Sequence, residues 1–65
     1  MQVFNVQGMT CGHCVRAVTE AIKGEDPDAD VQIDLGKGEV RVQSRLTAGQ
    51  VIALVEEEGY SASAA

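Results

Sequence analysis

The chain has two cysteines, and both lie in the segment Gly8-Met9-Thr10-Cys11-Gly12-His13-Cys14. Two thiols at C-x-x-C spacing can hold a soft metal ion between them, or they can cycle between a dithiol and a disulfide. The segment stands where a β-prone stretch gives way to a helical pattern, which predicts Cys11 in a loop and Cys14 in the first helical turn. The N–H groups and partial positive charge of a helix N-terminus favour the thiolate over the thiol.

A soft metal ion suits this set of donors. In a reducing compartment a thiolate pair selects ions such as Cu(I), which accepts two-coordinate geometry, so that two sulfur ligands suffice. A structural zinc site usually has four protein ligands, whereas the chain offers two Cys and the single His13. The ligand count therefore favours copper over zinc. The spacing by itself still leaves metal binding and redox chemistry open.

The redox alternative is a small thiol-disulfide oxidoreductase, because Cys-Gly-His-Cys is also the tetrapeptide of disulfide-isomerase active sites. Thioredoxin-like domains are larger, usually have Trp before the first Cys, and place a cis-proline opposite the cysteines. Here Thr10 precedes Cys11, the chain has no Trp, and its one proline is Pro27 in an acidic connector. These differences argue against the oxidoreductase.

Length and charge exclude several classes of function. A chain of 65 residues has room for one small domain with a thin core. Ten acidic and five basic side chains give a net charge of −5, which argues against nucleic-acid binding. No apolar run approaches the roughly 20 residues that span a bilayer, and residues 1–6 do not resemble a signal peptide. We therefore expect a cytoplasmic protein that does not insert into membranes.

The first half of the chain predicts a strand and a helix. Phe4 and Val6 alternate onto one face of a strand over residues 2–7. A helix is expected over about residues 13–23, because Val15, Val18 and Ile22 recur at helical spacing. Gly24 is predicted to end this helix. The acidic connector that follows is expected to be solvated, since its Asp-x-Asp-x-Asp run lacks the later residues of a calcium loop.

The second half predicts a hairpin, a helix and a short strand. Two alternating segments, Val31-Ile33-Leu35 and Val40-Val42, flank the turn Gly36-Lys37-Gly38. Thr47 is expected to cap a helix to about Glu58 whose buried stripe is Val51, Leu54 and Val55, with Ala48 and Ile52 at its margins. Gly59 ends it, and residues 60–64 form an edge-like strand. The order β-α-β-β-α-β predicts an α+β, ferredoxin-like fold: a four-stranded antiparallel sheet with two helices on one face.

Gly8-Met9-Thr10-Cys11-x-x-Cys14 within this element order resembles the heavy-metal-associated domain family over residues 1–65, as a single domain. More narrowly, it resembles the small bacterial copper chaperones related to the metal-binding domains of copper-transporting P-type ATPases. The resemblance implies that Cys11 and Cys14 bind one Cu(I), and that Met9 packs beneath the loop and does not ligate the metal. It further implies a cytosolic carrier, not an enzyme, that hands copper to such an ATPase by ligand exchange.

Other residues are expected around the metal because of this resemblance. Tyr60 follows Gly59 at the position where bacterial copper chaperones commonly carry Tyr beside the metal loop, and it can shield the copper or close the end of the core. His13 is either solvated, a third ligand, or the mediator of a copper-bridged homodimer. Thr10 and Gly12 complete the set. Zinc-selective relatives tend to have an acidic residue where Thr10 stands. A mercury- or zinc-binding module and a copper-storage module remain alternatives.

Overall fold

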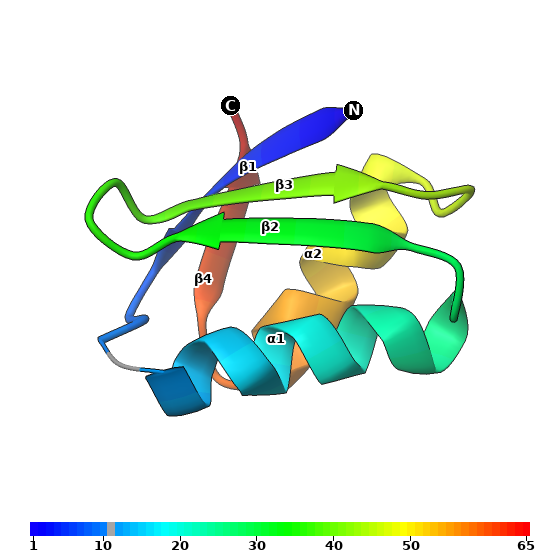
Figure 1. Ribbon diagram of the computed structural model, residues 1–65. Coiled ribbons are helices and arrows are strands. Elements are labelled where there is room, and N and C mark those ends of the chain that lie inside the picture. The colour runs from blue at the N-terminus through cyan, green and yellow to red at the C-terminus, as the bar shows by residue number, and fades with distance from the viewer. Residues whose placement is uncertain (11) are drawn as a thin grey trace.

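The computed structural model of the protein describes residues 1–10 and 12–65. Its elements in chain order are β1 (Gln2–Gln7), α1 (Gly12–Glu25), β2 (Asp30–Asp34), β3 (Glu39–Gln43), α2 (Ala48–Glu57) and β4 (Ser61–Ala64). This is the predicted β-α-β-β-α-β order (Figure 1).

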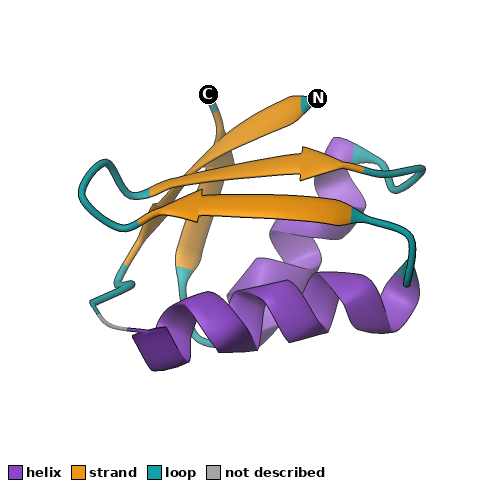
Figure 2. Ribbon diagram, in the orientation of Figure 1, coloured by secondary structure: helices purple, strands orange, loops and turns teal. Residues whose placement is uncertain are grey.

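The strands form an antiparallel sheet in the order β2-β3-β1-β4. In the register of β1, Phe4 pairs with Val40 of β3, and Val6 pairs with Ala62 of β4. Both helices cover the same face of this sheet (Figure 2). The predicted ferredoxin-like architecture is therefore confirmed.

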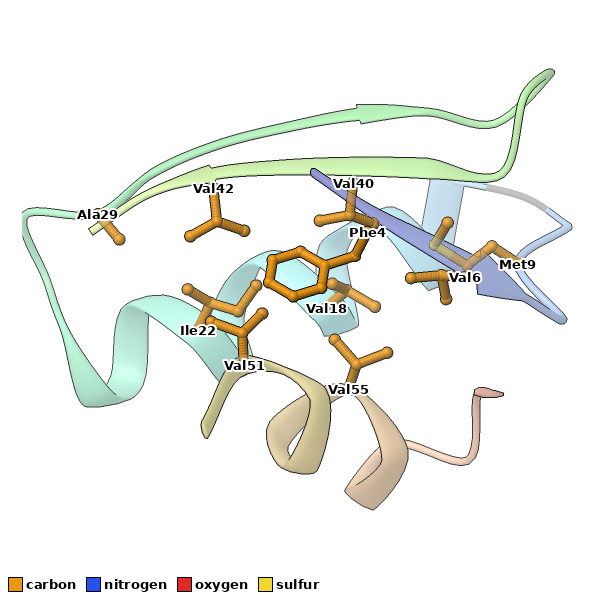
Figure 3. Packing of buried hydrophobic residues seen from close by; sticks show 10 residues of the cluster. All are labelled: Phe4, Val6, Met9, Val18, Ile22, Ala29, Val40, Val42, Val51 and Val55. Atoms are coloured by element: carbon orange, nitrogen blue, oxygen red, sulfur yellow. The ribbon is translucent and has the colours of Figure 1, made fainter. Parts of the chain in front are cut away.

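The core lies between the sheet and the helices, and short aliphatic side chains build it around the ring of Phe4 (Figure 3). Its buried members are Phe4, Val6, Met9, Val18, Ile22, Ala29, Val40, Val42, Val51 and Val55. Strand residues two apart share a face, as do helical residues three or four apart, so alternation and helical spacing direct these side chains to one layer. Of the apolar face predicted for α1, Val18 and Ile22 are buried, while Val15 is only half-buried.

The helix α1 runs past Gly24, so the prediction that this glycine ends it is wrong. Positive φ angles occur at Gly8, Gly38 and Gly59, and Gly24 keeps an ordinary helical backbone. The N–H of Asp26 still donates to the carbonyl of Ile22 at 3.0 Å. Pro27 follows, and proline disfavours helical backbone at the preceding residue and has no N–H to continue the hydrogen bonding.

The acidic connector is not solvated throughout, because Asp26 is only 5% exposed. Its Oδ1 accepts a hydrogen bond from the N–H of Asp28 at 3.2 Å, and its Oδ2 accepts one from the N–H of Arg45 at 3.3 Å. The Arg45 guanidinium Nε lies 3.9 Å from Oδ1. One buried carboxylate therefore joins the connector between α1 and β2 to the connector between β3 and α2.

The helix α2 begins with the predicted cap at Thr47. Its hydroxyl accepts from the N–H of Gln50 at 3.2 Å, and the Gln50 side chain accepts from the N–H of Thr47 at 2.8 Å, which completes a capping box. Val51 and Val55 are fully buried as expected, but Leu54 is only half-buried. Ile52, expected at the margin, packs against the core.

Within the described residues, neither α1 nor α2 combines the length and the apolar character that a membrane-crossing helix requires.

Candidate metal centre

Cys14 lies in the first turn of α1, as predicted. Its side chain is half-buried and packs against the hydrophobic core. The first turn of a helix presents backbone N–H groups without intrahelical acceptors, at the positive end of the helix dipole. A helix N-terminus is the kind of position at which cysteine thiolates, the form that binds metals, are favoured. Cys11, the second predicted ligand, lies outside the described residues, and its role stays a prediction.

Met9 is one of the buried core residues and is 9% exposed. It belongs to the same cluster as Val6, and both side chains lie toward one end of that cluster in Figure 3. The expected packing of Met9 into the core is therefore confirmed. That its thioether does not ligate the metal stays a prediction.

Tyr60 lies beside the start of the cysteine-containing segment, residues 8–14. A Cβ atom built on Gly8 would stand 3.3 Å from Cδ1 of the Tyr60 ring, so the ring lies against the Gly8 backbone. The ring is half-buried and also packs against the core. Gly8 has φ of +100°, a conformation that L side chains rarely adopt. Glycine at this position thus satisfies both the backbone angle and the close approach of Tyr60.

The remaining predicted site residues are exposed. Thr10, Gly12 and His13 all face solvent, and a Cβ built on Gly12 would meet no atom within 4 Å. Across residues 1–10 and 12–65, His, Cys, Asp and Glu side chains nowhere gather in a group of three that could hold a metal ion. The segment thus combines an apolar base, formed by Met9 and the half-buried Cys14, with an exposed polar rim.

Exposed charged side chains occur on α1 and at the end of α2. Arg16 and Glu20 form an i,i+4 pair with Nε to Oε1 at 3.4 Å, and their side chains are 78% and 72% exposed. Such a pair contributes only about 0.3–0.5 kcal/mol. Residues 56–58, all glutamates, are exposed where α2 ends, just before Gly59 and Tyr60. The surface next to Tyr60 is therefore negatively charged and hydrated.

No local pattern in the sequence specifies the contact between the turn that joins β2 to β3 and the end of β1. The N–H of Val6 donates to the carbonyl of Gly38 at 2.7 Å. The signal in the sequence was Gly36-Lys37-Gly38, which indicated a turn but not what the turn touches.

The chain is similar in sequence and in structure to known metal-binding proteins. A model of the heavy-metal-associated domain matches residues 3–61. The copper chaperone CopZ of Staphylococcus aureus is 36% identical over 62 residues, which cover 91% of this chain and 91% of CopZ. The structure of the copper chaperone Atx1 from Synechocystis is similar, with a TM-score of 0.93 and 30% identity over 97% of this chain and 100% of Atx1. A gold binding protein has a TM-score of 0.93 and 29% identity, and the match covers both chains completely. The chain therefore belongs to the heavy-metal-associated domain family.

Proposed function

We propose that this chain is a Cu(I) chaperone, which binds one copper ion through the thiolates of Cys11 and Cys14 and passes it to a copper-transporting P-type ATPase in the cytoplasm. The observation that carries the proposal is the position of Cys14 in the first turn of α1, inside a C-x-x-C motif. Thiolate donors select soft ions such as Cu(I). The similar proteins CopZ and Atx1 are copper chaperones, which supports copper as the cargo.

The transfer proceeds by ligand exchange. A thiolate of the partner attacks the bound copper, a three-coordinate species forms, and Cys11 and Cys14 release the ion in turn. The exposed Thr10, Gly12 and His13 leave the partner a path to the metal that requires no unfolding. No bond in a substrate molecule breaks, so this activity is transport of an ion and not enzymatic catalysis.

The proposed partner is the metal-binding domain of the ATPase, which would dock next to residues 8–14. Arg16 follows Cys14 by two residues, and residues 56–58 precede Tyr60; all of these charged side chains are exposed. Exposed charges steer encounters and choose partners more than they add affinity. Weak docking suits a carrier, because the complex must separate after each transfer.

The test is an anaerobic titration of the reduced protein with Cu(I) against a chromogenic competitor. The same titration is run on Cys11→Ser, on Cys14→Ser, and on His13→Asn as a matched control that leaves both sulfurs in place. We expect one tightly held Cu(I) per chain, lost in either cysteine variant and retained in the His13 variant. A second step adds the loaded protein to the metal-binding domain of a copper ATPase and follows the transfer of the ion.

Weak binding that the competitor removes easily would refute the chaperone proposal and would direct attention to disulfide exchange. Equal or tighter retention of Zn(II) or Hg(II) in parallel titrations would refute copper as the preferred cargo. Loss of binding in the His13 variant would instead assign this side chain as a third ligand. A loaded protein that retains its copper in the presence of the ATPase domain would indicate storage.

A further inference from the structure

We propose that the turn between β2 and β3 positions the cysteine-containing segment, residues 8–14, and that Gly38 is the positioning residue. This inference rests on the proposed function, because it assigns to that same site a residue outside residues 8–14. Three observations support the inference. The turn contacts the end of β1, its backbone requires glycine at position 38, and the Val6 that it contacts is buried in the same core cluster as Met9.

The turn lies against the end of β1. The register between β1 and β3 ends with Asn5 opposite Glu39. One residue further, the N–H of Val6 donates to the carbonyl of Gly38 at 2.7 Å. A Cβ built on Gly38 would stand only 2.9 Å from the carbonyl oxygen of Val6, closer than real Cβ atoms come. The two backbones are thus in direct contact, and a side chain at position 38 would separate them.

The backbone angle also requires glycine here. Gly38 has φ of +64°, in the left-handed region that is unfavourable for residues with a Cβ. The other glycine of the turn differs in both respects. Gly36 has no positive φ, and a Cβ built on it would meet Asp34 Oδ1 at 3.4 Å, an ordinary van der Waals distance. Gly36 is therefore a matched control within the same turn.

Val6 connects the turn to the cysteine-containing segment, because it contacts Gly38 and lies just before that segment in the chain. Its side chain is 3% exposed and belongs to the same core cluster as Met9, toward the same end (Figure 3). Two residues after Val6, Gly8 lies against the Tyr60 ring. Figure 1 shows the turn between β2 and β3 and the connection from β1 to α1 at the same end of the molecule. The start of the segment is therefore held from two sides, by the turn through Val6 and by Tyr60 through Gly8.

The substitution Gly38→Ala places its methyl group against a backbone oxygen, which cannot rotate away as a flexible side chain can. The turn must then move, and the hydrogen bond from Val6 lengthens. We expect hydrogen exchange at the Val6 amide to become roughly tenfold faster. The release of Cu(I) to a competitor should also become faster. Gly36→Ala is expected to match the wild type in both measurements.

The experiment compares wild type, Gly38→Ala, Gly36→Ala and Thr47→Ala. Amide exchange is followed by NMR on the reduced metal-free protein, and copper release is followed by stopped flow after loading. Thr47→Ala removes the cap of α2 away from the turn, so it lowers stability without touching Val6. Gly38→Asn is prepared in addition, because asparagine tolerates left-handed backbone but carries the same Cβ. It tests the contact if the alanine variant does not fold.

Faster copper release in Gly38→Ala or Gly38→Asn, with Gly36→Ala and Thr47→Ala unchanged, supports the positioning role. Equal release rates in the Gly38 and Thr47 variants would reduce the effect to a loss of stability and overturn the inference. Unchanged exchange at Val6 in the Gly38 variants would also overturn it. A wild-type protein that retains no Cu(I) would overturn the proposed function, and exchange at Val6 would then still decide separately whether the turn holds β1.

Discussion

Replacing Asp26 by asparagine tests whether a buried carboxylate holds the two connectors of the fold together. The two oxygens of Asp26 accept from different amides, that of Asp28 at 3.2 Å and that of Arg45 at 3.3 Å. Asparagine keeps a single acceptor oxygen and turns its NH₂ group toward the other amide. One backbone N–H therefore loses its partner, while the second keeps a weaker, uncharged one.

The size of the effect follows from these contacts. A hydrogen bond to a charged group contributes about 1.5–3 kcal/mol, and a neutral one about 0.5–1.5 kcal/mol. Both contacts are long for N–H···O, so the lower ends of these ranges apply: one charged bond is lost and the other becomes neutral, and we expect a loss of about 2.5 kcal/mol in the free energy of unfolding. The Arg45 guanidinium adds little, because its side chain is 76% exposed and its Nε lies 3.9 Å from the carboxylate. For a domain of this size the loss lowers Tm by about 10–20 °C.

The assay is urea unfolding of the reduced, metal-free protein followed by far-UV circular dichroism. Asp28→Asn is the control, since that side chain is exposed, and we expect its stability to stay within about 0.5 kcal/mol of wild type. Copper binding should not change in Asp26→Asn, because twelve residues of helical rise place Asp26 about 18 Å from Cys14. Equal stability of the Asp26 and Asp28 variants would refute this reasoning.

Further variants test the site and the helix ends. Met9→Ala should cost about 2–5 kcal/mol of stability yet keep one Cu(I) per chain in the competitor titration, because Met9 is buried in the core; loss of copper from the folded variant would make its sulfur a ligand. Gly24→Ala should stabilise the protein by up to about 1 kcal/mol, because Gly24 is helical and unobstructed, whereas Gly59→Ala should cost about 1–2 kcal/mol, because its φ is +94°. Thermal unfolding should therefore show a higher Tm for Gly24→Ala and a lower Tm for Gly59→Ala. Two Tm shifts of the same sign would contradict the backbone conformations given for these two glycines. Thr47→Ala should lose about 1 kcal/mol with its capping box, and an unchanged midpoint in urea would show that the cap contributes nothing.

Periodic patterns predicted most of the fold, because each one depends on neighbours along the chain. Alternation at Phe4 and Val6 identified β1, and helical spacing at Val18 and Ile22 identified α1. The end of α1 was misplaced at Gly24, since glycine is only a permissive signal, while Pro27 is a steric obstacle to a helix. Leu54 was expected in the buried stripe of α2 but is only half-buried, while Ile52, expected at the margin, is half-buried and packs against the core, because tertiary packing decides which side of an apolar stripe turns inward.

The candidate site divides in the same way. The donor chemistry of Cys14 and its place at the start of a helix were both evident in the sequence, because a C-x-x-C motif and a helical pattern are local. The burial of Met9 was implied by family resemblance and is confirmed by the packing. The contact of Tyr60 with Gly8 joins residues more than fifty positions apart. The family resemblance placed Tyr60 beside the metal loop, but no local pattern specifies the pair.

The sequence by itself predicted the order of the elements, the C-x-x-C spacing of two thiols at a helix start and the family, since these depend on residue types and short spacings. The tertiary structure alone decided which segments far apart in the chain contact each other. It buried Asp26 between two connectors and placed the Gly38 backbone against that of Val6. The physical reason is that hydrogen bonds and close contacts between distant segments depend on how the sheet twists and how the helices pack, and these arise only when the whole core forms.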